Sequence, residues 1–285
     1  MNKTSITRYS IALLLGCSLA SAGRAQYYYK DIVVTAQINA GYRALRDNKV
    51  SQVSLATTTP GAPAEPVMAI QQTVYPAQRK VVTYSKSPDA TESWLTSVYD
   101  ENGLLQQTTD SAAEMITRSQ YRYDANNRIV TLTSNAVPFN SAPENEVHQW
   151  TYNSNGQPQQ MIKIKDNRDT TIVSFVPDEQ GNIGEEKATR KQGNVGSTFY
   201  YYDAQHRLTD VARYNKKANR ILPDYMFEYG QGTLPSQMIL VPEGSNDYQV
   251  WKYIYNEKGL KEKDLCYNKQ KQLVGTITYN YTFAR

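Results

Sequence analysis

A short phrase recurs through most of this 285-residue chain and limits what the chain can fold into. The phrase is an aromatic or apolar residue, any residue, tyrosine, aspartate or asparagine, two variable residues, glycine or asparagine, and then leucine or isoleucine one position later. With the tyrosine position as the marker, copies fall at residues 99, 123, 152, 177, 202, 229 and 255. Steps of 24 to 29 residues are typical of an array built from one supersecondary unit.

The chemistry of the phrase predicts a strand that runs into a hairpin turn. Residues two apart in a strand share a face, so paired rings such as Trp150 and Tyr152 should lie side by side. The aspartate or asparagine can bind the backbone two residues on, and the glycine or asparagine tolerates a positive φ. The residues that define the repeat are Tyr99, Asp100, Gly103, Tyr121, Tyr123, Asp124, Trp150, Tyr152, Gly156, Tyr200, Tyr202, Asp203, Tyr253, Tyr255 and Gly259.

Two strands per unit predict an all-β fold of roughly 14 to 16 antiparallel strands. We expect a long curled antiparallel meander of about seven β-hairpin repeats, with a short N-terminal cap that contains a helix. Such a sheet has two open edges, and the cap is the natural element to protect the first of them.

The phrase also resembles the YD repeat of the RHS family of bacterial proteins, written approximately as Y-D-x-x-G-R-L. The copies at Tyr123, Tyr202 and Tyr255 are the most similar, and the resemblance covers about residues 70–285. It implies hairpins joined edge to edge into a curling sheet, which in large members closes around a toxin. This chain has no toxin-like domain after the repeats, no D-P-x-G processing motif and too few units to enclose a protein. The resemblance therefore implies the sheet without toxin delivery, as in the small exported YD-repeat proteins.

The first 25 residues have the three parts of a secretory signal. Lys3 and Arg8 precede an apolar stretch that is too short to span a bilayer, and small residues follow it. We favour cleavage before Gln26; the alternative is a lipobox at residues 14–17, in which Cys17 would carry a lipid anchor. Since no later apolar run is long enough for a transmembrane span, we expect an exported protein that is periplasmic, associated with the outer membrane, or extracellular.

Four segments are predicted along the chain: a signal peptide (residues 1–25), an N-terminal cap (26–56), a linker (57–66) and the repeat domain (67–285). Within the cap, residues 27–34 read as a strand or an anchored extended segment, residues 36–46 as a helix, and residues 50–56 as a strand. The threonine, proline and alanine of the linker exclude a helix interior or a central strand.

Charge and cysteine content narrow the classes of function. Without the three basic residues of the signal, 28 basic side chains stand against 27 acidic ones, so composition gives no reason to expect nucleic acid as a partner. Cys266 is the only cysteine in the mature part, which excludes an internal disulfide. Its strand-like surroundings predict a buried, inert thiol.

The residues that could carry chemistry are few. His206 occupies the turn position of its repeat and is predicted to be a left-handed turn residue, whereas His148 is predicted to be a surface strand residue. Motifs for zinc, a nucleophilic serine or a phosphate-binding loop are missing from the sequence, so we predict no catalytic, metal or cofactor site. Paired carboxylates for glycoside hydrolysis stay open, because such pairs meet only in space.

Three functions follow from these observations. We favour an exported non-enzymatic protein that binds a protein or glycan partner in the cell envelope or outside the cell. The alternative is a carrier that holds a lipid or a small apolar ligand in the curled sheet, and a weaker alternative is a polysaccharide-active enzyme. The repeated aromatic residues, which we call the aromatic ladder, either present solvent-exposed rings to a partner or pack one repeat against the next. A large apolar cavity on the inner face of the sheet would favour the carrier, whereas a filled core with exposed rings would favour the binding protein.

Overall fold

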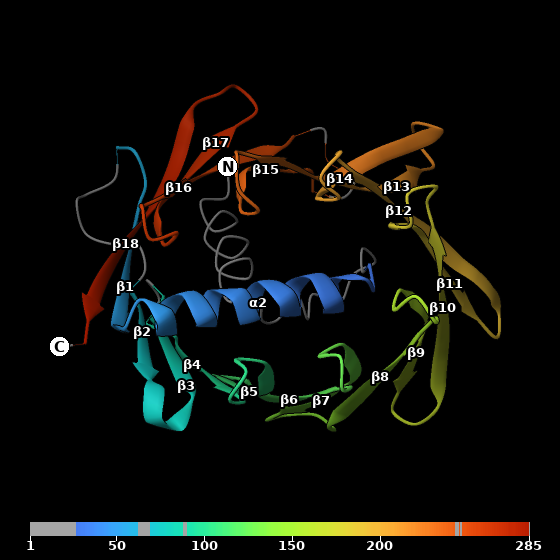
Figure 1. Ribbon diagram of the computed structural model, residues 1–285, viewed down its shortest axis with the longest axis horizontal. Helices are drawn as coiled ribbons and strands as arrows, with labels where there is room; N and C mark the ends of the chain where they lie inside the picture. The colour runs from blue at the N-terminus through green and yellow to red at the C-terminus, as the bar shows by residue number, and fades with distance from the viewer. Residues whose placement is uncertain (1–26, 62–68, 88–89, 243–244, 246, 285) are drawn as a thin grey trace.

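The computed structural model describes residues 27–61, 69–87, 90–242, 245 and 247–284. In these residues 18 strands form one antiparallel sheet, and β1 pairs with β18 as well as with β2, so that the sheet closes into a barrel (Figure 1). The elements are the helix α2 (Lys30–Asp47), the short 3-10 helix η1 (Pro76–Gln78), and the strands β1 (Val50–Thr58), β2 (Ala69–Tyr75), β3 (Lys80–Lys86), β4 (Glu92–Tyr99), β5 (Leu105–Ala112), β6 (Met115–Tyr123), β7 (Ile129–Pro138), β8 (Glu144–Tyr152), β9 (Pro158–Lys165), β10 (Asp169–Pro177), β11 (Ile183–Arg190), β12 (Gly193–Tyr202), β13 (Leu208–Asn215), β14 (Arg220–Tyr229), β15 (Pro235–Leu240), β16 (Gln249–Tyr255), β17 (Lys261–Asn268) and β18 (Leu273–Phe283).

The prediction of a long curled meander of about seven hairpins was wrong, because the sheet is closed and has more strands than expected. The strand at residues 50–58 closes it: Val53 faces Tyr281 of β18 on one side and Gln72 of β2 on the other. The first and last strands thus satisfy each other's backbone groups, and no edge is left for a cap to protect. The sequence placed residues 50–56 in the cap because they carry no copy of the phrase.

Side chains alternate between a buried inner face and a more exposed outer face. In β10, Thr171, Val173 and Phe175 are buried, while Ile172 between them and Val176 after them are exposed. The inner side chains pack into three apolar clusters; α2 contributes to each of them, and Tyr27, Tyr28 and Tyr29 just before it contribute to one. The apolar core of the protein is therefore the inside of the barrel.

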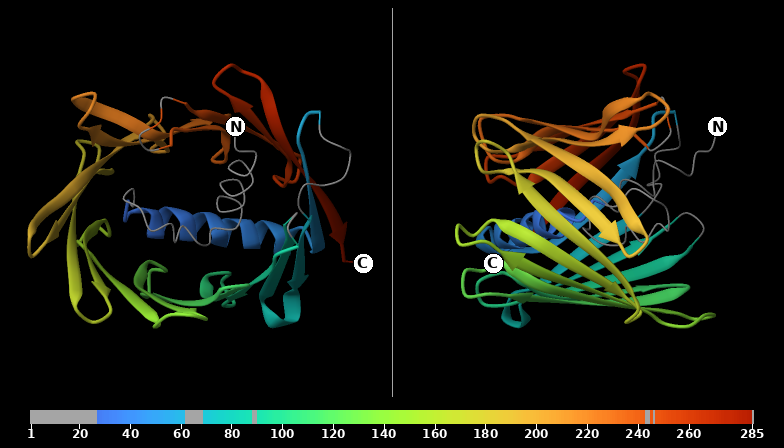
Figure 2. Two further views of the ribbon diagram at one scale, coloured as in Figure 1. Left: turned by 180° about the vertical axis from the view of Figure 1, so that it is seen from behind. Right: turned by 90° about the vertical axis from the view of Figure 1, so that its right-hand side faces the viewer.

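Helix α2 crosses the interior of the barrel (Figures 1 and 2). Its Tyr42 ring stacks on Tyr99 of β4 at 3.8 Å, and the Asn39 side chain accepts the backbone N–H of Leu105 at 2.8 Å. The helix begins at Lys30, six residues before the predicted start. The strand predicted at residues 27–34 was wrong, because the barrel wall supplies partners for a helix N-terminus there.

The helix occupies only part of the interior. Eighteen strands about 4.8 Å apart and tilted by about 40° close into a barrel roughly 35 Å across, whereas an α-helix is about 10 Å wide. One face of α2 accordingly stays exposed to solvent inside the barrel, at Ala36, Gln37, Ala40 and Gly41. Water therefore reaches the interior beside the helix.

The two ends of the barrel carry different connections. The turns of the repeated phrase, which we call the repeat turns, join β4–β5 and every second pair of strands up to β16–β17, and they all lie at one end. The other hairpins lie at the end we call the opposite end. Helix α2 is nearer the repeat-turn end, since Arg43 packs against Gly103 and Asn48 donates to the carbonyl of Lys258 (Figure 2, right).

Six of the seven repeat turns are built in the same way, and the turn between β14 and β15 is the exception. The Asp124 carboxylate accepts the backbone N–H groups of Asn126 and Arg128 at 2.9 and 3.0 Å, and Asn256 does the same for Lys258 and Leu260. The fourth position has a positive φ, at Gly103, Asn127, Gly156, Gly181, His206 and Gly259. The side chain and the left-handed residue together reverse the chain, which is the physical reason for the phrase.

Candidate functional site

The repeat-defining aromatic residues point into the barrel. Trp150 and Tyr200 are buried, and Tyr121, Tyr123, Tyr152, Tyr202, Tyr253 and Tyr255 are half-buried against the apolar clusters. The Tyr123 hydroxyl donates to the carbonyl of Leu105, and the hydroxyls at 152, 202, 229 and 255 each donate to the first residue of the strand that follows the preceding repeat turn. The ladder ties one repeat to the next rather than presenting rings to solvent.

The remaining predicted positions occupy the repeat turns or lie outside the described residues. Asp100, Gly103, Asp124, Gly156, Asp203 and Gly259 are turn residues, and Cys17 is outside the described range. His206 has φ 59°, the left-handed turn conformation predicted for it. Cys266 is fully buried, and burial raises the pKa of its thiol to about 12, in agreement with an inert cysteine.

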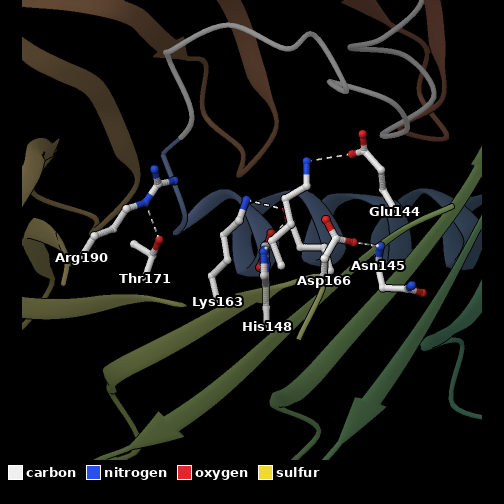
Figure 3. A network of polar contacts seen from close by, with 10 residues as sticks. Glu144, Asn145, His148, Lys163, Asp166, Thr171 and Arg190 are labelled. Atoms are coloured by element: carbon white, nitrogen blue, oxygen red, sulfur yellow. Dashed lines mark hydrogen bonds and ion pairs between the residues drawn. The ribbon is translucent and has the colours of Figure 1, made fainter. Parts of the chain in front are cut away.

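A group of ionisable side chains inside the barrel was not predicted. We call it the inner charge cluster; it joins Asp31 at the start of α2 to Glu146 and His148 on β8 and Lys163 on β9, and Glu186 on β11 binds the backbone just before the helix. Figure 3 shows His148 and Lys163 of this cluster. The strand residues of the cluster lie on the inward faces of their strands. On β8, Glu146, His148 and Trp150 are two residues apart and therefore point to the same side, into the barrel.

His148 lies at the centre of the inner charge cluster. Its Nδ1 contacts Asp31 Oδ2 at 2.5 Å and its Nε2 contacts Glu146 Oε1 at 2.9 Å. The second oxygen of Glu146 is 2.6 Å from the Lys163 ammonium. The prediction of a surface histidine was wrong: His148 is 4% exposed. The ring of Trp150 two residues later was the available signal, because it marks the inward face.

Burial opposes a charged imidazole, but the carboxylates of Asp31 and Glu146 outweigh it and raise the pKa of His148 to about 9. Burial likewise opposes the charged form of Glu146, yet hydrogen bonds from His148 and Lys163 lower its pKa to about 2. At neutral pH His148 is therefore an imidazolium and Glu146 a carboxylate. Negative and positive side chains alternate in the order Asp31, His148, Glu146 and Lys163. Each buried charge therefore has an oppositely charged partner.

Glu186 holds the beginning of the helix. Its carboxylate accepts the backbone N–H groups of Tyr28 and Tyr29 at 2.9 to 3.0 Å, and no side chain of the helix itself caps that end. A carboxylate is stabilising there because the first N–H groups of a helix lack partners and the helix dipole is positive at that end. Burial nevertheless raises the pKa of Glu186 above its usual value.

The inner charge cluster is suited to holding α2 against the wall. Both ring nitrogens of His148 are occupied by carboxylates, so the imidazole is not available as a general base for a substrate. Among the residues that the structure describes, no three His, Cys, Asp or Glu side chains are grouped as a metal site would require. Within the same residues, no helix is long and apolar enough to cross a membrane.

A row of hydroxyl side chains lies beside this cluster on the inner wall. The strand register places Ser97, Thr108, Ser119 and Ser134 next to one another across β4 to β7, and Glu146 continues the row on β8. Ser97 and Thr108 are buried, whereas Ser119 and Ser134, which also face inward, are half-buried. We call these four residues the hydroxyl row. Such small side chains leave the wall open to solvent or to a polar ligand.

Comparisons with known proteins add little to this description. No protein-family model matches the chain, and no curated protein matches it. A crystal structure of a porin-like protein from Bacteroides uniformis ATCC 8492 aligns with 83% of this chain and 97% of its own, with 13% identity and a TM-score of 0.37. A likeness of this degree implies nothing about ligand or activity.

Proposed function

We propose that the chain is an exported, non-enzymatic binding protein of the cell envelope, and that it binds a polar ligand at the hydroxyl row on the inner wall of the barrel. The hydroxyl row is the observation that carries this proposal. Ser119 and Ser134 face inward on adjacent strands, are only half-buried and lie within hydrogen-bond distance of each other, so a ligand entering the barrel meets them together with Glu146. Groups of this kind orient a polar ligand by hydrogen bonds.

The residues on the outer wall of β5 to β8 favour a barrel surrounded by water over a barrel embedded in lipid. The outward-facing residues of β5 to β8 are mostly polar or charged, whereas a barrel that spans a membrane needs an apolar outer band. Those residues are Gln107, Thr109, Ser111, Ile116, Arg118, Gln120, Arg122, Thr131, Thr133, Asn135, Val137, Asn145, Val147, Gln149 and Thr151. This part of the outer wall suits the aqueous part of the envelope or the medium outside the cell. The resemblance to YD repeats stays a prediction.

The inner face also bears on the alternative functions. The apolar part of the interior is packed by α2 and by aromatic rings, which leaves it less suited to a lipid than the polar wall is to a polar ligand. The rings of the ladder are engaged in packing and in hydrogen bonds to the wall, so a partner would not dock on them. Binding of a polar ligand at the hydroxyl row agrees with the packed apolar interior and with the engaged aromatic rings.

The proposal can be tested with neighbouring residues on β6 and β7 whose side chains point into and out of the barrel. Ser119→Leu with Ser134→Leu fills the inner wall, whereas Gln120→Leu with Thr133→Leu adds the same side chains to the outer wall. Binding of radiolabelled soluble oligosaccharides and peptides from envelope extracts should be lost in the first double variant and kept in the second. Equal binding by both would contradict the proposal, and so would conversion of the bound compound into a product.

A further inference from the structure

Basic side chains gather at the opposite end, although the whole mature chain is nearly neutral. Three consecutive hairpins there join β9–β10, β11–β12 and β13–β14. Their acidic residues are Asp166 and Asp169, and the Asp166 carboxylate already accepts the backbone N–H of Asn145 (Figure 3). Their basic residues, which we call the basic arc, are Arg168, Arg190, Lys191, Lys216, Lys217 and Arg220.

The basic arc is available to a partner. All six side chains are exposed, and none of them forms an ion pair within the part of the chain that the structure describes. The arginines of the repeat turns differ, since Arg128 and Arg207 are bound to Asp124 and Asp203 of their own turns. The opposite end therefore carries six exposed basic side chains without an ion pair among the described residues, whereas these two repeat-turn arginines are neutralised by their own turns.

The basic arc is continuous with the inner wall. Neighbouring hairpins are two strand spacings apart, so the arc follows the rim for about 20 Å. Arg190 belongs to the arc and also reaches inward, where its Nε donates to Thr171 Oγ1 at 2.9 Å (Figure 3). Thr171 pairs with Lys163 of the inner charge cluster across β9 and β10. A ligand chain that lies along the arc can thus continue onto polar groups inside the barrel.

We propose that the ligand is a polysaccharide that carries carboxylate or sulfate groups, held by the basic arc at the rim and by the hydroxyl row within. This inference rests on the proposed function and names its ligand class. Exposed lysines and arginines attract anionic groups through long-range fields, and arginine can bind a carboxylate or sulfate in bidentate fashion. Neutral sugar hydroxyls are suited to the serine and threonine side chains of the wall.

The shape of the charged region favours a linear chain over a flat anionic membrane. A bilayer would meet the whole rim, but the hairpins that join β5–β6 and β7–β8 contribute Glu114, Phe139 and Asn140 rather than basic residues. Only part of the rim is positive. A flexible anionic chain can follow that part and avoid the rest.

Binding to polygalacturonate, a carboxylated polysaccharide, tests the inference, with neutral dextran and vesicles containing anionic lipid as the other probes. Calorimetry at low and high salt is run on the wild type, on Lys191→Ser/Lys216→Ser/Lys217→Ser, and on Arg118→Ser/Arg122→Ser/Lys263→Ser. The last variant removes the same charge from the outer wall. We expect the arc variant to weaken polygalacturonate binding about tenfold and to reduce its salt dependence, while the outer-wall variant changes it less than about twofold.

Each other outcome overturns the inference in a distinguishable way. Equal loss in both variants means that net charge, and not the arc, is responsible. Binding of dextran with the same affinity means that the ligand is uncharged, in which case the proposed function survives if Ser119→Leu/Ser134→Leu abolishes that binding. Capture of anionic vesicles without polygalacturonate assigns the arc to a membrane surface. Failure to bind any of the three probes also overturns it, and the oligosaccharide test above then decides the proposed function alone.

Discussion

The half of the interior near the repeat turns and the half near the opposite end are built from different kinds of residues. Near the repeat turns, the same tyrosine, turn carboxylate and left-handed residue recur from one hairpin to the next. At the opposite end, the inner wall carries residues that occur once, such as His148, Lys163 and Ser134. We conclude that the repeated residues form the barrel, and that the side chains able to select a ligand lie at positions that are not part of the repeated phrase.

The largest effect should come from the aromatic half. Trp150→Ala removes a ring that is 4% exposed and stacked on Phe175 at 5.1 Å. We expect the free energy of unfolding to fall by about 3–5 kcal/mol because a cavity is left behind. Trp94→Ala on the outer wall, where the ring is 43% exposed, should cost less than about 1 kcal/mol. Urea unfolding followed by circular dichroism measures both, and similar losses would contradict the assignment of inner and outer faces.

The next largest loss of stability should come from the inner charge cluster, whose residues are not part of the repeat. His148→Ala leaves the carboxylates of Asp31 and Glu146 buried without their shared partner, so we expect a loss of about 3 kcal/mol. Hydrogen exchange should show faster exchange of the backbone amides in the first turns of α2. Gln149→Ala, the outward neighbour, is the control and should change neither quantity. Unchanged exchange in α2 would show that the inner charge cluster does not hold the helix.

A smaller, pH-dependent effect should accompany it. The pKa of His148 is raised to about 9 in the folded protein, against about 6.5 for an unfolded chain. Its contribution to stability is therefore complete below about pH 6.5 and is lost as the pH rises through about 9. The difference in unfolding free energy between the wild type and His148→Ala should shrink from pH 6 to pH 10. A difference that stays constant over this range would contradict a buried imidazolium.

The smallest effects belong to the repeat turns. Gly259 has φ 70°, so Gly259→Ala should cost about 1 kcal/mol through backbone strain alone, since no atom lies within 4 Å of the added carbon. Lys271, with φ 60° in the last hairpin, offers the reverse change, and Lys271→Gly should alter stability by less than about 0.5 kcal/mol. Thermal unfolding of the two variants compares them. A larger loss in Lys271→Gly would mean that the side chain, not the backbone, matters there.

Much of the local structure could be predicted from the sequence. The phrase predicted the hairpins because a turn needs only a few neighbouring residues, and the side-chain acceptor and positive φ at Asp124 and Asn127 follow from that local chemistry. Closure could not be predicted in this way. It depends on Val50–Thr58 meeting Leu273–Phe283, and neither the phrase nor any turn encodes that contact.

The candidate site was harder still, because its residues come together only when the barrel has formed. Asp31 and His148 are 117 residues apart in the chain, so their pairing has no local signature. The basic arc was hidden for a different reason. Net charge sums residues from both ends of the barrel, and only the assignment of alternate turns to opposite ends brings the basic arc together.

Closure by the first and last strands has a consequence for the order of folding. The Ser51 side chain donates to the carbonyl of Thr282, 231 residues along the chain. Contacts of such long range form slowly, because the entropy of closing the loop between them must be overcome first. During synthesis the hairpins can form one after another, but β1 has to wait unpaired on one side until β18 emerges. A chain that stops short of β18 would keep two unpaired strand edges and would be prone to aggregate.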